Sequence, residues 1–145
     1  MNARRMVLSA ALSALLAVPL GSAFAQTATA DKMDKVIFQV SDADPAKWNL
    51  ALNNARNVQK DLGKDKVAIE IVAYGPGIGM LKMDSAVGTR VAEAVSSGVD
   101  VVACENTMHG QKLTRADMLP KIGYVEAGVV ELMSKQKAGY AYIRP

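Results

Sequence analysis

From residue 34 to the end of the chain, the spacing of apolar residues changes repeatedly between a pattern typical of strands and one typical of helices. Short apolar runs rich in β-branched residues predict five strands, at 35–40, 67–74, 99–103, 123–126 and 140–143. Between these runs, apolar residues recur at helical spacing, which predicts helices over 45–62, from about 84 to 97, over 107–113 and over 129–137. The chain is therefore expected to alternate between strands and helices.

The helix that begins at Pro45 carries the clearest local signals. Asp44 can accept a hydrogen bond from a free amide of the first turn, and Pro45 suits a position whose N–H would be unpaired. Gly63 is placed to end this helix. Asn106 is predicted to cap the short helix over 107–113.

This alternation predicts an α/β protein. We expect a single three-layer α/β/α domain over residues 34–145, with a mostly parallel five-stranded sheet and a flavodoxin-like general layout. The length suits one domain, and the strand order is left open because periodicity does not determine it. Sheets of this kind place their sites beyond the carboxyl ends of the strands.

The first 25 residues follow a different pattern. Arg4 and Arg5 precede an almost entirely apolar stretch over 6–21, and Ala23-Phe-Ala25 matches a cleavage site. This series predicts a secretory signal peptide over 1–25, a flexible leader over 26–33 and a periplasmic mature protein. A retained membrane anchor is the weaker alternative, because the apolar stretch is short and ends in small residues.

Charge and composition exclude several kinds of partner. The chain of 145 residues has 17 basic and 14 acidic residues, a net charge of +3, and cleavage would lower this to +1 by removing two arginines. Basic runs interleaved with aromatics are absent, so no nucleic-acid partner is expected. No second apolar segment is long enough to span a membrane after cleavage. One cysteine and one histidine predict neither an internal disulfide nor a metal site, and no cofactor is expected.

Candidate chemistry lies after the first three predicted strands, at 41–44, 75–79 and 104–110. In a parallel sheet these segments share one edge. Cys104 is the candidate nucleophile, because a helix N-terminus just after it would favour the thiolate. The alternative is a packed, unreactive cysteine. His109 could assist as a base or a cation, or it could simply be a surface histidine.

The segment Gly75-Pro-Gly77-Ile-Gly79 could bind an anion through its backbone amides. It lacks the spacing of a dinucleotide fingerprint, and a tight strand-to-helix turn is the alternative. Asn106 and Thr107 complete the candidate binding residues, because they follow Cys104 at the start of the next helix.

Four segments of the chain carry a family resemblance: Tyr74-Gly-Pro-Gly77, Gly98-Val-Asp-Val-Val-Ala-Cys-Glu-Asn-Thr107, Leu113-Thr-x-x-Asp117-Met-Leu-Pro120 and Gly139-Tyr-Ala-Tyr-Ile143. In these segments the chain resembles the DsrE/DsrF-like family of sulfur-relay proteins. The resemblance implies a small α/β fold that assembles into homo-trimers or homo-hexamers. It also implies that Cys104 corresponds to the cysteine on which some members carry sulfur as a persulfide. The signal peptide and the absence of a second cysteine depart from the cytoplasmic relay proteins.

The sequence therefore predicts a periplasmic sulfur carrier or sulfurtransferase-like protein of sulfur-compound metabolism. Its partners would be sulfur donor and acceptor proteins or small sulfur compounds. The alternative is a non-enzymatic binding protein that uses the same strand-end pocket for a small anion or a protein partner, with Cys104 only packed.

Overall fold

The computed structural model describes residues 33–145, so the predicted signal peptide and nearly all of the predicted leader lie outside the described residues. Five strands in this range form one sheet: β1 (Asp34–Val40), β2 (Val67–Ala73), β3 (Asp100–Cys104), β4 (Gly123–Val125) and β5 (Ala141–Ile143). The α-helices of the same range are α1 (Pro45–Leu62), α2 (Gly88–Ser96), α3 (Glu105–Gly110) and α4 (Gly128–Lys137).

All neighbouring strands of the sheet are parallel, in the order β4-β3-β2-β1-β5. The predicted α/β class, with one parallel five-stranded sheet, is confirmed. Strands β1 to β4 lie consecutively across the sheet, and the chain then returns to place β5 beside β1. The layers are flavodoxin-like, whereas this order differs from the flavodoxin order, in which the second strand lies at one edge.

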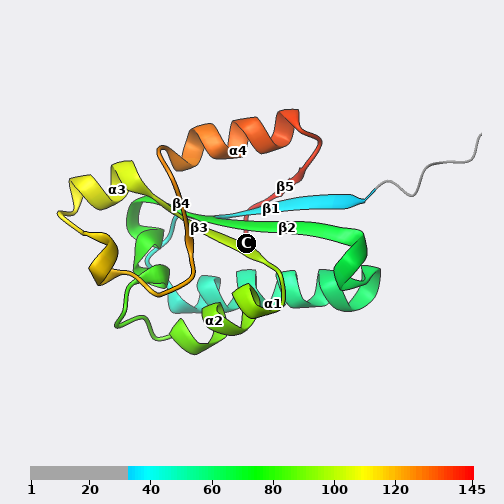
Figure 1. The fold of residues 1–145 in the computed structure, drawn as a ribbon, viewed down its shortest axis with the longest axis horizontal. Coiled ribbons are helices and arrows are strands. Elements are labelled where there is room, and N and C mark those ends of the chain that lie inside the picture. The colour runs from blue at the N-terminus through cyan, green and yellow to red at the C-terminus, as the bar shows by residue number, and fades with distance from the viewer. Residues whose placement is uncertain (1–32) are drawn as a thin grey trace, which may run out of the picture. The chain divides into compact units, whose positions relative to one another are not determined.

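Helices cover the sheet unequally (Figure 1). Helices α1 and α2 cover one face, where they enclose the larger core, whereas α4 lies alone on the opposite face of the described domain. The smaller core under α4 is formed by one buried residue from each of four elements: Ile37, Val72, Val102 and Leu132. Helix α3 follows β3 directly, so it lies at the carboxyl edge of the sheet and covers neither face.

Local signals around α1 are confirmed. The Asp44 carboxylate accepts a hydrogen bond from the Ala46 amide at 2.8 Å, and Gly63 follows the last turn with a φ of 96°. The predicted helix over 107–113 is wrong at both ends, because α3 starts at Glu105 and ends at Gly110. The helix predicted from about residue 84 begins only at Gly88, as α2, since the residues before Gly88 form turns.

A buried ion pair attaches α4 to the sheet. Glu70 of β2 is only 3% exposed and pairs with the Lys135 ammonium. Burial raises the pKa of the Glu70 carboxyl, although the hydrogen bond and charge of Lys135 act in the opposite direction. The second Glu70 oxygen, Oε1, has no hydrogen-bond partner in the described chain. Glu70 therefore depends on Lys135 to remain charged inside the protein.

We predict that Lys135→Met destabilises the protein by about 3 kcal/mol, because it leaves a buried carboxylate without its counter-ion. The loss should be smaller at pH 5 than at pH 8, since a protonated Glu70 needs no counter-ion and its raised pKa favours that form at lower pH. Urea unfolding at both pH values measures this. Lys137→Met is the matched control, because Lys137 is an exposed residue of the same helix. Equal losses in the two variants would contradict the prediction.

Candidate functional site

Cys104 lies where the starts of two helices meet at the carboxyl edge of the sheet. Its Sγ accepts a hydrogen bond from the amide of Thr107 in α3 at 3.4 Å, so Cys104 is itself the N-cap of that helix. A second hydrogen bond comes from the amide of Gly128, the first residue of α4, at 3.3 Å. Both donors belong to the first turns of helices, whose free amides favour negative charge.

The end of β4 connects these two helix starts. The carbonyl of Glu126 accepts a hydrogen bond from the Asn106 amide at 3.0 Å and lies 3.8 Å from the Cys104 Sγ. Because β4 pairs with β3 up to the Cys104–Val125 register position, the turn that leads into α4 is held beside the thiol. The sheet register thus determines where the Gly128 amide points.

The Thr107 side chain adds a third donor. Its Oγ1 accepts a hydrogen bond from the Gly75 amide at 2.9 Å, which leaves the hydroxyl hydrogen for the Cys104 sulfur. Thr107 therefore joins the turn after β2 to the thiol after β3. The structure thus brings the predicted site residues Thr107 and Cys104 together.

Two opposing influences set the pKa of the Cys104 thiol. Burial is the largest and raises the pKa, since Cys104 is only 5% exposed. Hydrogen bonds from the Thr107 hydroxyl and from the Gly128 and Thr107 amides lower it, and together they outweigh burial. The pKa therefore lies below the ordinary value for a thiol, and the surroundings stabilise a thiolate.

Gly128 lies in close contact with Tyr74. A Cβ on Gly128 would lie 3.0 Å from the Tyr74 side chain, so a larger residue there would force that ring to shift away from the start of α4. Burial and the neighbouring Tyr142 raise the pKa of the Tyr74 hydroxyl. Neither Gly128 nor Tyr74 was recognised as a site residue from the sequence. The position of Gly128 just after a predicted strand was the available signal.

Polar side chains continue along the same edge toward β5. The Tyr142 hydroxyl donates to the Gln39 side-chain oxygen at 2.5 Å, and the Gln39 amide donates to the Ser41 hydroxyl at 3.0 Å. Ser41 in turn faces the Tyr74 hydroxyl. This arrangement places a row of neutral hydrogen-bonding groups beside the thiol site.

Asn106 does not cap α3, contrary to the prediction. Cys104 occupies the capping position, and Asn106 is an exposed residue inside the first turn. Its amide donates to the Glu126 carbonyl, and among residues 33–145 its side chain forms no hydrogen bond. The backbone of Asn106 helps to lower the pKa of Cys104, whereas its side chain supplies no donor to the sulfur.

The three glycines after β2 do not form an anion-binding loop. They begin a 3₁₀ helix over Gly75–Leu81, in which the amides of Gly75 and Gly77 are already bonded to Thr107 and to the Tyr74 carbonyl. A Cβ on Gly77 would lie 2.2 Å from the Val40 carbonyl oxygen, and one on Gly79 would lie 3.1 Å from the Trp48 ring. Gly77 and Gly79 therefore serve close packing, and the tight turn was the better interpretation.

His109 lies in the last turn of α3 and is exposed. The hydrogen bonds of the Cys104 Sγ go to Thr107, Gly128 and Glu126, so none joins His109 to the thiol. The role of His109 as a base or cation that assists Cys104 stays a prediction, and no hydrogen bond between the two side chains supports it.

Metal binding and membrane insertion receive no support from the described part of the chain. Within residues 33–145, no three side chains of the types that bind metals lie close enough together to hold an ion. None of the helices in that range has the length and apolar character needed to cross a membrane.

Fold and site together define a small α/β protein with a hydrogen-bonded cysteine at the carboxyl edge of a parallel sheet. No protein-family model matches the chain, and no curated protein does. A solved protein of unknown function, MTH1491 from Methanobacterium thermoautotrophicum, is 35% identical, with a TM-score of 0.73 over 77% of this chain and 99% of that chain. This chain therefore belongs to the same protein family as MTH1491.

A second solved protein of unknown function, BT1422 from Bacteroides thetaiotaomicron, shares the fold at 16% identity. Its TM-score is 0.62, over 77% of this chain and 95% of that chain. These similarities support the α/β fold.

We predict that Thr107→Val raises the pKa of the Cys104 thiol, because it removes the hydroxyl donor and retains the backbone amide. Thr107→Ser keeps the hydroxyl and should leave the pKa near the wild-type value. The measurement is the rate of reaction with methyl methanethiosulfonate, a small thiol reagent, as a function of pH. An unchanged midpoint in Thr107→Val would contradict a role for the hydroxyl.

Proposed function

We propose that this protein is a periplasmic carrier of sulfane sulfur, which it holds as a persulfide on Cys104. The observation that carries the proposal is the pair of helix-start amides, from Thr107 and Gly128, that donate to the Cys104 Sγ. Such donors stabilise a thiolate, the form that acts as a nucleophile. The resemblance to the DsrE/DsrF-like family supports the same role.

The transfer chemistry balances without a cofactor. The Cys104 thiolate attacks the outer sulfur of a donor persulfide, R–S–S⁻. A new S–S bond forms at Cys104, the donor S–S bond breaks, and the donor leaves as the thiolate R–S⁻. A thiolate of the acceptor then attacks the outer sulfur on Cys104 and restores the free Cys104 thiolate.

The limited access to the Cys104 thiol restricts the size of the sulfur donors that can react with it. Because Cys104 is only 5% exposed, a bulky reagent cannot reach Sγ unless the edge of the sheet opens. Small inorganic polysulfides are therefore better donors than folded protein persulfides for the closed form. This predicts that reactivity falls steeply with the size of the thiol reagent.

The same burial favours a second candidate function. A cysteine with this little exposure can also be a structural N-cap, with its sulfur accepting amide hydrogen bonds in place of a serine or aspartate oxygen. In that case the protein would be a binding protein and Cys104 would not exchange sulfur.

We predict that incubation with inorganic polysulfide adds about 32 Da, the mass of one sulfur atom, to the intact wild-type protein. Dithiothreitol should remove this mass, and the unreactive control Cys104→Ser should gain none. Intact-protein mass spectrometry under native conditions measures both. Addition of sulfur only after unfolding would refute the carrier function and support the structural role of Cys104.

Assembly into a homo-trimer or homo-hexamer is also part of the proposal. Three apolar side chains on the outer side of α4 are more than half exposed: Val129, Val130 and Met133. Contiguous exposed apolar residues on a helix favour association with another protein surface. A second copy of this chain is the partner that the family resemblance implies.

Export is the remaining part of the proposal. We predict that the protein recovered from the periplasmic fraction begins at Gln26, because the cleavage pattern ends at Ala25. N-terminal sequencing of that fraction measures this. Replacing Ala23 and Ala25 by bulky residues should block cleavage, and a soluble form that begins at Met1 would contradict the prediction.

A further inference from the structure

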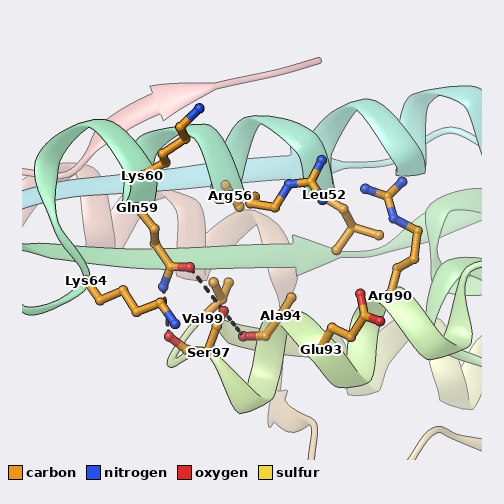
Figure 2. Close-up of a pocket in the computed structure, with 11 residues that line it drawn as sticks. Leu52, Arg56, Gln59, Lys60, Lys64, Arg90, Glu93, Ala94, Ser97 and Val99 are labelled. Carbon is orange, nitrogen blue, oxygen red and sulfur yellow. Dashed lines mark hydrogen bonds between the residues drawn. The ribbon is translucent and has the colours of Figure 1, made fainter.

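A groove, drawn in Figure 2, lies between α1 and α2. These two helices lie on the face of the sheet opposite α4 (Figure 1). The groove has a volume of about 460 Å³, within the usual range for sites that bind small molecules. The apolar part of its lining comes from Leu52 and Ala55 of α1, Ala94 of α2 and Val99. Two small alanine side chains, one from each helix, leave space that larger residues would fill.

Hydrogen bonds tie the two helices together at both ends of the groove. At one end, the Gln59 side chain donates to the Ser97 carbonyl at 2.9 Å, and the Ser97 hydroxyl donates back at 3.0 Å, as Figure 2 shows. At the other end, the Arg90 guanidinium binds the side-chain oxygens of Asn49 and Asn53. These bonds hold α1 and α2 at a fixed separation, so the space between them is preformed.

The groove carries an excess of positive charge. Four cations line it, Arg56, Lys60, Lys64 and Arg90, against the single carboxylate of Glu93. Among residues 33–145, no carboxylate forms an ion pair with Arg56, Lys60 or Lys64. The partners of Arg90 are neutral amides, so its charge is oriented without being neutralised.

Stability alone does not account for this arrangement. Arg56 and Lys60 are four residues apart on α1, and like charges at this spacing on a helix repel. Lys64 adds a third positive charge from the turn that follows Gly63. Bringing an anion into the groove would relieve the repulsion. The apolar part of the lining, which adjoins the cations, would bury a hydrocarbon group of the same ligand.

We propose that the groove between α1 and α2 binds a small organic anion with an apolar body. The apolar body lies against Leu52, Ala55, Ala94 and Val99, and the anionic group pairs with Arg56, Lys60 and Lys64. This binding site is separate from the Cys104 site and does not depend on sulfur transfer. It gives the protein a second function, the recognition of a carboxylate or similar anion.

Octanoate is the probe, because it joins one carboxylate to a hydrocarbon chain that fits the volume. Titration of the ¹⁵N-labelled mature protein at low salt should shift amide signals of α1 and α2, with a dissociation constant below about 1 mM. 1-Octanol measures the binding of the hydrocarbon chain without a charge. Sulfate measures the binding of an anion without a hydrocarbon chain. Each should bind at least about tenfold more weakly than octanoate. Equal binding of sulfate or octanol, or no shifts with octanoate, would overturn the proposal.

The double variant Arg56→Gln/Lys60→Gln should weaken octanoate binding at least about tenfold, while its thermal midpoint stays the same or rises, because repulsion is removed. Arg56→Lys should retain binding, and Lys137→Gln on α4 is the matched control for a lost surface charge. Cys104→Ser should bind octanoate normally, which separates this proposal from the sulfur-carrier function. Unchanged affinity in the double variant would overturn the assignment of the anion to these cations.

Discussion

The attachment of α4 to the sheet is the constraint on which the candidate site depends. Among the described residues α4 alone covers its face, and it rests there on Leu132 and on the buried pair of Glu70 and Lys135. Glu70 is costly to bury, so the helix cannot move away without leaving a carboxylate unpaired in an apolar environment. Because α4 is held in this position, its first amide, that of Gly128, points at the Cys104 sulfur. Packing near one end of the helix thus determines the chemistry at its other end.

At the thiol, the same geometry both stabilises the thiolate and restricts access to it. Hydrogen bonds from Thr107 and Gly128 lower the pKa of Cys104 although burial raises it. Donors can reach a sulfur from two helices only if both helices crowd around it, so stabilisation and exposure oppose each other here. A carrier built in this way favours small sulfur donors or needs a local opening. A structural cysteine would need neither, which is why reactivity in the folded protein decides between the two functions.

The two faces of the sheet offer surfaces of different chemistry. Helix α4 leaves apolar side chains such as Val130 exposed, which suits contact with another protein surface. The opposite face carries the basic groove between α1 and α2, whose ends are closed by the Gln59–Ser97 and Arg90–Asn53 hydrogen bonds. Since the sheet separates this groove from the thiol, a ligand there and sulfur at Cys104 can be tested independently. Membership of the MTH1491 family is compatible with both functions, because MTH1491 is a protein of unknown function.

The sequence by itself determined the class of fold, the capping of α1 by Asp44 and the position of Cys104 at a strand end. Each of these follows from local periodicity or from a cap whose partners lie within a few residues. Tertiary structure decided the rest of the site. Gly128 is 24 residues from Cys104 and donates to it only because β4 pairs in parallel with β3. Gly77 looked like an anion ligand, yet it meets the Val40 carbonyl of another strand. Contacts between distant segments depend on strand order and register, which a pattern of apolar and polar residues leaves undetermined.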